Sequence, residues 1–278
     1  MHLTYSVVPG FRPALAFTLT YLSLVVLVPL VALALKAFGL SPAEMWALLS
    51  EPRVVAAFKI SLWTALLAAF LNIFIGLLIA WVLTRYAVPG RRLWDALVDL
   101  PFALPTAVAG ITLTAIYAPN GWIGQYLSDW GLQVAFAPPG IVIALLFIGL
   151  PFIVRTVQPV LAELDGAIEE AAATLGANRA QTFWRVMLPN LLPALLTGFA
   201  LAFARGIGEY GSVIFIAGNM PFVSEIVPLV IVTKLEQYDY AGATTVALAM
   251  LLLSFVLLVL INALQWWTRK WTGKEEGR

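Results

Sequence analysis

Long apolar runs joined by short polar links dominate the amino-acid sequence. A helix needs about 20 largely apolar residues to cross the hydrocarbon core of a membrane, and it pairs its own backbone groups where lipid offers no partner. Six runs reach this length, at residues 14–36, 58–84, 96–118, 139–161, 190–217 and 241–267. The pattern predicts an all-α integral membrane protein with six transmembrane helices. We expect a single transmembrane domain over residues 1–278, with its core at about 54–270.

The distribution of Lys and Arg predicts the orientation of these helices. Basic residues gather in or beside the links after the second, fourth and sixth runs, at Arg85, Arg91, Arg92, Arg155, Arg179, Arg185, Arg269, Lys270, Lys274 and Arg278. The link 119–138 has no Lys or Arg, and the link 218–240 has only Lys234. Because basic links favour the inner side of a membrane, we expect both termini in the cytoplasm. Trp266, Trp267 and Trp271 are then expected to anchor the last helix at the inner surface.

Two segments depart from simple spanning helices. Pro101 and Pro105, within LPFALPTAVAG, remove backbone donors from the third run, so we expect an interruption in its cytoplasmic half. Residues 223–235 are apolar but too short to cross, and we expect them to dip into the membrane or lie at its outer surface. The first run is too long for the apolar part of a cleaved signal peptide, so we expect it to remain as an anchor.

The composition narrows the classes of function. Hydrophobic residues make up 62% of the chain and charged residues 11%, which is too few charges to cover a water-soluble domain. A net charge of +1 gives no reason to expect nucleic acid as a partner. There is no cysteine, the one histidine is His2 at the N-terminus, and the carboxylates are scattered. We therefore expect a protein that is not an enzyme, has no catalytic residues and binds no metal or cofactor itself.

The link of about 163–189, between the fourth and fifth runs, has the pattern of two short amphipathic helices. Asp165 is suited to cap the first helix and Gly176 to end it. Asn178 and Gln181 resemble a capping pair for the second helix, and Pro189 marks a bend into the fifth run. Each helix has one apolar face, made of Ile168, Ala171, Ala172 and Leu175 in the first and of Ala180, Phe183, Trp184, Met187 and Leu188 in the second. Spacing alone leaves two interpretations equally open: a docking knob for another protein, or an interfacial loop packed on its own bundle.

A longer pattern runs through the same link. It reads EAA, three residues, Gly, nine residues, the aliphatic Val186, one residue and then LP, without a gap from Glu170 to Pro189. This resembles the signature of binding-protein-dependent ABC importer permeases. The resemblance implies the type I (MetI-like) permease fold and a loop that inserts into a groove on a separate ATPase. The docking residues that it implies are Glu169, Glu170, Ala171, Ala172, Gly176, Arg179, Leu188 and Pro189.

The chain lacks the phosphate-binding loop that ATP hydrolysis requires. No G-x-x-x-x-G-K-[ST] motif occurs, and Gly273-Lys274 has neither the preceding glycine nor the following hydroxyl. The resemblance therefore implies that ATP and Mg²⁺ are used by the partner ATPase and not by this chain.

Three further stretches resemble the sulfate/thiosulfate permease subunits of the CysT type. They are residues 100–111 (LPFALPTAVAGI), 203–221 (FARGIGEYGSVIFIAGNMP) and 224–244, which contains KLEQYDYAGAT. Molybdate permeases share the G-E-[FY]-G element, so the KLEQYDYAGAT stretch discriminates better between the two groups. The resemblance implies alternating access in a bacterial inner membrane. It also implies two copies of the ATPase, a second related permease chain and a periplasmic protein that delivers the oxyanion. Sulfate and thiosulfate are not distinguished.

Two charged residues lie inside the fifth run. Arg205 and Glu209 are four positions apart and so share one helical face. An isolated charge at this depth costs roughly 2.5–3.5 kcal/mol, so a partner is expected. The pair either fixes helix packing or supplies a cation, Arg205, to a passing dianion, with Glu209 preventing tight trapping. Pro105, Thr106 and Gly208 are the other candidates for the translocation pathway.

A secondary transporter driven by an ion gradient is the main alternative. Such transporters often have paired broken helices in two inverted halves and several intramembrane carboxylates. Here only the third run is clearly broken by proline, and Glu209 has a potential partner in Arg205. The predicted docking link distinguishes the two classes, because a secondary transporter has no ATPase to bind.

Overall fold

The structure, a computed structural model, describes residues 11–272, apart from the side chains of Arg12 and of residues 264–272. The predicted tryptophan anchor (Trp266, Trp267 and Trp271) and the basic side chains of Arg269 and Lys270 fall among these undescribed side chains. His2, Lys274 and Arg278 lie outside the described residues altogether.

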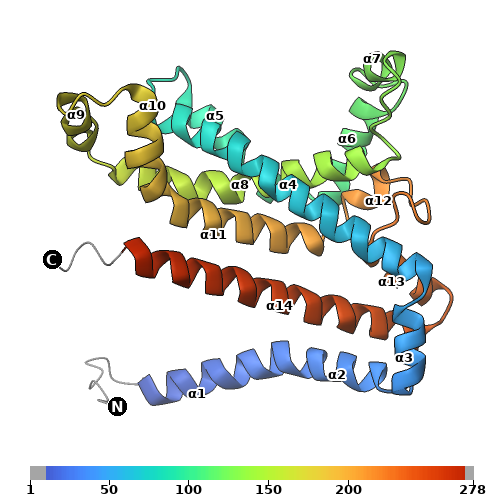
Figure 1. Ribbon diagram of the computed structural model, residues 1–278. Helices are drawn as coiled ribbons and strands as arrows, with labels where there is room; N and C mark the ends of the chain where they lie inside the picture. Colours follow the sequence, from blue (N-terminus) through green and yellow to red (C-terminus); the bar gives the residue numbers. More distant parts are fainter. Residues whose placement is uncertain (1–10, 273–278) are drawn as a thin grey trace.

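Long helices make up most of the described chain (Figure 1), and residues 11–272 contain no β-strand. Five helical stretches are long and apolar enough to span a membrane. They are 13–37 (α1 Phe11–Leu22, the π-helical η1 Ser23–Leu27 and α2 Val28–Ala37), α4 Pro52–Arg85, α8 Pro138–Glu163, 179–207 (α10 Arg179–Thr182, the π-helical η2 Phe183–Met187 and α11 Leu188–Ile207) and the described part of α14 Tyr240–Thr272. A sixth span consists of α5 Arg91–Ala103 and α6 Thr106–Tyr117, bent by 110°. The predicted all-α fold with six spans is confirmed for the described residues.

The remaining helices are short. They are α3 Pro42–Leu49, α7 Gly124–Asp129, α9 Gly166–Thr174, α12 Val213–Ile216 and α13 Val227–Glu236. Ser41 and Glu44 form a capping box at the start of α3. The hydrogen bonds that the Ser41 side chain and backbone donate to the Glu44 carboxylate lower the pKa of that group.

The core of the bundle is built where α4, α8 and α11 cross, and small residues let their backbones approach closely. A Cβ added to Gly76 of α4 would lie 2.6 Å from Ile153 Cγ2 of α8, and one added to Gly198 of α11 would lie 2.9 Å from Ile153 Cα. Asn72 of α4 is buried and donates from Nδ2 to the carbonyl of Leu146 of α8 at 3.1 Å. These contacts fix the register of the three helices in a core that has little room for larger side chains.

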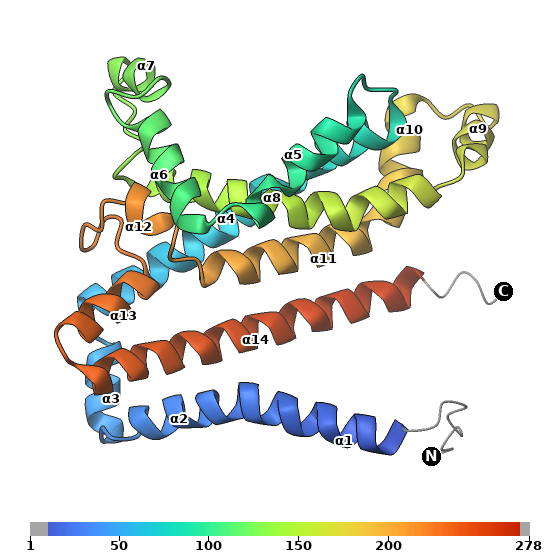
Figure 2. The same cartoon turned by 180° about the vertical axis from the view of Figure 1, so that it is seen from behind.

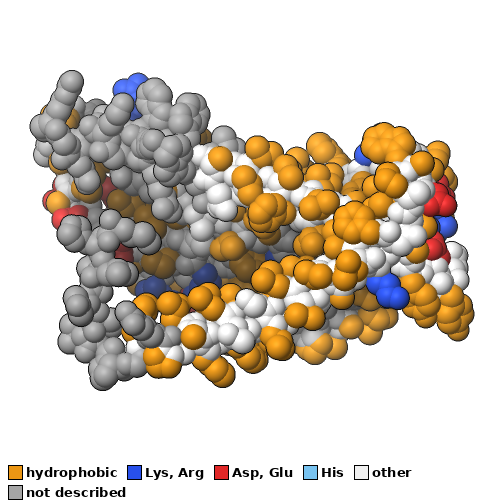
Figure 3. Space-filling view, turned by 90° about the horizontal axis from the view of Figure 1, so that it is seen from below, with side chains coloured by type: hydrophobic (Ala, Val, Ile, Leu, Met, Phe, Trp, Pro, Cys, Tyr) orange, Lys and Arg blue, Asp and Glu red, His pale blue; other side chains and the backbone are white. Residues whose placement is uncertain are grey.

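The two ends of the bundle carry different short elements. In Figures 1 and 2 the start of α1 and the end of α14 lie at the same end as α9 and α10. Helices α3, α7, α12 and α13 lie at the opposite end in both views. Figure 3 shows hydrophobic side chains over most of the described surface along the helices, as expected of a surface that faces lipid.

The third span is broken more sharply than its sequence predicts. Helix α5 ends at Ala103, Leu104 is extended (φ −79°, ψ 135°), and α6 begins after Pro105. A residue that precedes proline avoids helical geometry, which explains the conformation of Leu104. Pro101, by contrast, lies inside α5 and is buried. The predicted proline interruption is confirmed, but it turns the chain by 110° instead of only interrupting a straight span.

The prediction of one continuous fifth helix over 190–217 is wrong. Helix α11 ends at Ile207, Gly208 follows, and the chain is irregular up to Ser212, after which the four-residue α12 starts at Val213. The apolar run hid this break because no proline marks it. Gly211 is required there, since a Cβ at this position would overlap Thr106 Oγ1 of α6.

The predicted bend near Pro189 is present, but the helix is distorted before the proline and not at it. Residues 183–187 form a π-helical turn in which the Leu188 N–H donates to the Phe183 carbonyl. Pro189 has no N–H to donate to the Arg185 carbonyl, and its ring would crowd that carbonyl, so the helix widens in this turn. Figure 1 shows α10 and α11 running in clearly different directions across this turn.

The segment around the start of α13 is tied to the first turns of α4. Glu225, only 1% exposed, accepts from Arg53 Nε at 2.8 Å and from Arg53 Nη2 at 2.6 Å. The Val227 N–H, at the start of α13, donates to Ser61 Oγ of α4 at 2.9 Å. The predicted short segment 223–235 is therefore mainly helix α13, and it lies against the first turns of α4.

Candidate functional site

The first helix of the docking segment (residues 163–189) has both of the caps that its sequence predicts. Asp165 Oδ1 accepts from the Ala167 N–H at 3.0 Å at the start of α9. At the other end Gly176 has φ +81°, a left-handed conformation that favours glycine. The Gly176 N–H donates to the Ala173 carbonyl and the Ala177 N–H to the Ala172 carbonyl, both at 3.0 Å. These two bonds form a Schellman motif, which stops the helix at a defined residue.

The second helix begins with the predicted capping pair. Asn178 Oδ1 accepts from the Gln181 N–H, and Gln181 Oε1 accepts from the Asn178 N–H, each at 2.9 Å. Its predicted apolar face is only partly correct. Met187 is buried and Phe183 packs edge-on against Trp81 of α4 with ring centroids 5.7 Å apart. Trp184, however, is 64% exposed, and so is outside the buried face of this helix.

The apolar face of α9 is largely uncovered. Of the four residues predicted to form it, only Ala172 is buried, while Leu175 is 88% exposed and Ile168 is also exposed. Figures 1 and 2 show α9 at the extreme end of the molecule, beyond the long helices. An apolar face of this kind suits contact with a second protein better than packing on its own bundle.

The other predicted docking residues divide between the bundle and the free surface. Glu169 faces the bundle, where its carboxylate lies 3.0 Å from Arg85 Nη2 at the end of α4. Arg85 Nη2 also donates to the Leu164 carbonyl at 3.4 Å, so α4 holds the start of the docking segment. Glu170 and Arg179 are exposed, as are Ala171, Gly176 and Pro189, and Leu188 is half-buried. Of the predicted docking residues, these exposed ones are accessible to a partner protein.

The breaks in the third and fifth spans meet each other. Thr106, the first residue of α6, touches Gly211, and the site of a Cβ on Gly110 of α6 is occupied by the backbone of Ser212. Pro105 and Thr106 are therefore brought to the irregular segment 208–212. No side chain caps the start of α6, so the positive end of this half-helix lies at the break.

The charged pair of the fifth span lies at the same break. Arg205 is in the last turn of α11, and its Nη1 is 2.5 Å from Glu209 Oε2. Glu209 is 2% exposed, and its Oε1 accepts from the N–H and the hydroxyl of Ser212 at 2.9 and 3.0 Å. The Arg205 side chain is 38% exposed, and a Cβ added to Gly208 would meet no atom within 4 Å. The predicted pair exists, with Glu209 just beyond the helix and Arg205 partly open to its surroundings.

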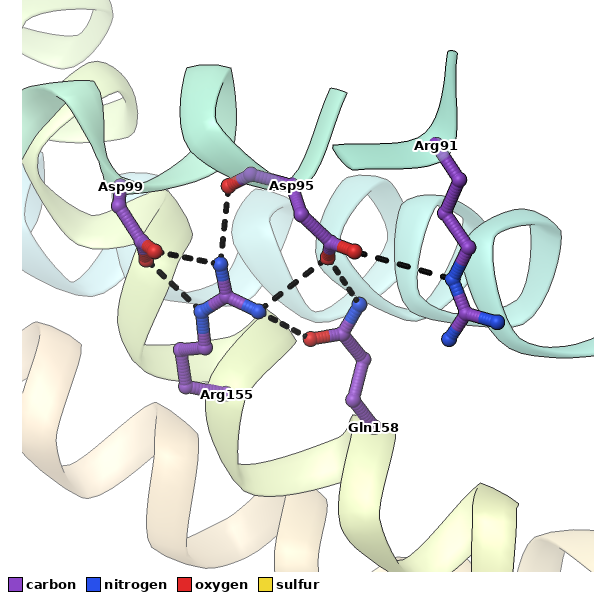
Figure 4. A network of polar contacts seen from close by, with 5 residues as sticks. All are labelled: Arg91, Asp95, Asp99, Arg155 and Gln158. Carbon is purple, nitrogen blue, oxygen red and sulfur yellow. Dashed lines mark hydrogen bonds and ion pairs between the residues drawn. The ribbon is translucent and has the colours of Figure 1, made fainter. Parts of the chain in front are cut away.

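A polar cluster between α5 and α8 was not predicted (Figure 4). Arg155 of α8 donates from Nε and Nη2 to the two carboxylate oxygens of Asp99 at 2.7 and 2.6 Å. Asp95 accepts from Arg155 Nη2 through its backbone carbonyl and from Gln158 Nε2 through its carboxylate, at 2.9 and 3.0 Å. The spacing of Arg91, Asp95 and Asp99 at i, i+4 and i+8 was the available sequence signal, because it places all three on one face of α5.

Comparison with known proteins identifies the family to which this chain belongs. Residues 72–272 match the family described as "Binding-protein-dependent transport system inner membrane component". The sulfate transport system permease protein CysT of Synechococcus elongatus is 51% identical over 92% of this chain and 92% of that protein. The protein of the same name from Escherichia coli is 48% identical over 93% of this chain and 94% of that protein. The chain belongs to the CysT permease family. The resemblance carried by the EAA pattern is thereby confirmed.

Solved structures agree with the predicted type of fold. A chain of a bacterial alginate ABC transporter, in complex with an alginate pentasaccharide-bound periplasmic protein, has a TM-score of 0.74 at 18% identity. The match covers 91% of this chain and 92% of that one. A chain of the MetNI methionine ABC transporter, in an inward-facing conformation, has a TM-score of 0.60 at 19% identity and covers 82% of this chain and 99% of that one. The predicted ABC importer type I permease fold is confirmed.

Proposed function

We propose that this chain is a transmembrane permease subunit of an ATP-driven ABC importer that moves sulfate or thiosulfate across a bacterial inner membrane by alternating access. The observation that carries the proposal is the docking segment, whose capped helix α9 presents an apolar face that its own bundle does not cover. The names of the relatives, all at about half identity, support sulfate transport.

The partner at the docking segment is an ABC ATPase, present in two copies. Ile168, Glu170 and Leu175 enter a groove on this partner, and Gly176 lets the chain turn away directly after α9. ATP and Mg²⁺ are bound and used by the ATPase, since this chain has no phosphate-binding loop. The permease contributes no catalytic residue; it converts movement at α9 into movement of the membrane helices. Both termini are proposed to be cytoplasmic, and the position of α9 at the same end as the start of α1 and the end of α14 supports this orientation.

The oxyanion passes beside the meeting point of the two broken spans. Arg205 supplies a cation, and the uncapped start of α6 supplies the positive end of a helix dipole. Glu209 neutralises part of this charge, which keeps a dianion from being held too tightly. A second, related permease chain completes the pathway, and a periplasmic binding protein delivers the anion at the end that carries α3, α7 and α13.

Two alternatives have less support. A molybdate importer shares the Gly208-to-Gly211 element, but the similar permeases carry the name of sulfate transport. A gradient-driven transporter gains one argument from the structure, because the fifth span is broken as well as the third. It does not account for the exposed docking segment or for the family match.

The test of this proposal is purification of the intact complex from membranes, mass identification of every subunit, and reconstitution with the purified binding protein. We expect an ATPase and a second permease to copurify, and uptake of radiolabelled sulfate to require ATP and to compete with thiosulfate better than with molybdate. Uptake driven by an ion gradient without ATP would contradict the proposal.

A further inference from the structure

Helix α5 is weakly held by apolar contacts. Only Val98 and Pro101 among its residues are buried, whereas Leu93, Trp94, Leu97, Leu100 and Phe102 are exposed. Phe102 makes one edge-on contact with Phe152 of α8, with ring centroids 5.2 Å apart. The position of α5 on α8 therefore depends largely on the polar cluster around Arg155, which we call the α5–α8 clamp (Asp95, Asp99, Arg155 and Gln158).

The clamp uses every donor of one guanidinium. Besides the two bonds to Asp99 and the bond to the Asp95 carbonyl, Arg155 Nη1 donates to Gln158 Oε1 at 2.6 Å and to Asp95 Oδ1 at 3.3 Å. An arginine has five N–H groups, so none is left over. A bidentate, fully satisfied pair of this kind fixes orientation as well as distance. Arg91 lies outside the clamp: its side chain is exposed, and its Nε is 3.7 Å from Asp95 Oδ2 on the same helix.

The clamp lies between the docking segment and the broken span. Arg155 is eight residues before Glu163, the last residue of α8, or about 12 Å along the helix. The chain then passes through Leu164 and Asp165 directly into α9. On α5, Asp99 is four residues before Ala103, the last residue of the helix, or about 6 Å from the break. The clamp thus links the helix that enters the docking segment to the half-helix that ends at the break.

We infer that Arg155, Asp95 and Asp99 are positioning residues for transport, which make α5 move with α8 when the ATPase displaces α9. This rests on the proposed function. Separating α5 from α8 would break a bidentate, charge-assisted pair between Arg155 and Asp99, whose side chains are only partly exposed at 35% and 48%, so the two helices move together. Movement of α8 then reaches Pro105 and, through Thr106 and Gly211, the segment beside Arg205.

The experiment measures sulfate uptake and ATP hydrolysis in the same proteoliposomes and takes their ratio. The variants are Arg155→Lys, which keeps the charge but loses the bidentate geometry, and Asp99→Asn, which keeps the shape but loses the charge. We expect the complex to assemble with its ATPase and the ratio to fall at least about fivefold in each variant. The exchanged pair Arg155→Asp with Asp99→Arg should recover part of this loss. Arg91→Gln, the control, removes only the long 3.7 Å pair and should leave the ratio within about twofold of the original.

The outcomes separate this inference from the proposed function. If the unchanged complex shows no ATP-driven uptake, the proposed function fails. If it transports sulfate and both clamp variants keep its ratio, only the clamp's role is overturned. Loss of assembly in every clamp variant would also overturn it, since the cluster would then serve folding and not coupling.

Discussion

Gly211 and Thr106 touch so closely that a Cβ on the glycine would overlap the threonine hydroxyl oxygen. The contact joins the irregular end of the fifth span to the start of α6, which are more than 100 residues apart in the sequence. Both spans give up helical geometry where they meet, and the buried Glu209 stabilises the turn through Ser212. The proposed pathway depends on this crossing of two broken helices.

Because Gly211 packs directly against Thr106 where the two broken helices cross, we expect Gly211→Ala to impair transport. The added methyl group must push Thr106 or the segment 208–212 aside, at a cost of about 1–3 kcal/mol. We expect a lower melting temperature of the purified complex and reduced sulfate uptake, with the ATPase still bound. Gly206→Ala is the control, because its Cβ would meet Ala65 at an ordinary 3.5 Å. Equal behaviour of the two variants would show that the crossing is not tightly packed.

The Arg205–Glu209 pair can be tested for a role beyond packing. Arg205→Ala leaves the buried Glu209 without its cation, so lost uptake alone would not separate packing from passage of the anion. The double variant Arg205→Gln with Glu209→Gln removes both charges and avoids this cost. We expect it to assemble with near-original thermal stability but to take up sulfate at less than about a tenth of the original rate. Normal uptake by the double variant would exclude Arg205 from the pathway and leave it a structural role.

Substitutions on the exposed surface of the docking segment should uncouple transport from the ATPase while leaving the helix bundle intact. Glu170→Lys reverses an exposed charge, and Gly176→Asp places a side chain where φ is +81° and shortens the capped end of α9. We expect both to weaken ATPase copurification and to reduce uptake. Glu236→Lys makes the same charge change on the exposed end of α13, at the opposite end of the molecule, and should leave ATPase copurification unchanged. Full ATPase binding in both docking variants would favour a transporter without an ATPase.

The ion pair between Arg53, at the start of α4, and Glu225 is expected to stabilise the fold. Arg53→Ala strands a carboxylate that is 1% exposed, and we expect a loss of about 1–3 kcal/mol, less than for a fully buried pair because Arg53 is about one-third exposed. Thermal unfolding of the purified complex measures this loss. Arg53→Ala with Glu225→Gln should recover part of it. An unchanged melting temperature in the single variant would contradict this prediction and would mean that Glu225 is protonated or paired with another group.

The sequence predicts features that depend on nearby residues. Hydropathy locates the spans because lipid requires each of them to be long and apolar. The caps at Asp165, Gly176 and Asn178 follow from bonds between residues at most five positions apart. The family was also accessible, because the docking pattern is continuous from Glu170 to Pro189.

Features that depend on distant contacts were missed. The break after Ile207 lies in an apolar run without proline, and it requires Thr106 of another span to be recognised. Arg155 was interpreted only as an inner basic residue, since its partners Asp95 and Asp99 are 60 and 56 residues away. The π-helical turn at 183–187 was missed as well, because a regular 3.6-residue period does not represent it.

The central claim is that α9 binds an ATPase, and a cross-link from its most exposed apolar position tests this directly. A photoreactive amino acid in place of Leu175 can be activated in native membranes and the adduct identified by mass spectrometry. We predict one main protein adduct, to an ABC ATPase subunit, whose yield changes when ATP is added. Adducts only to lipid or to this chain's own helices would contradict the claim.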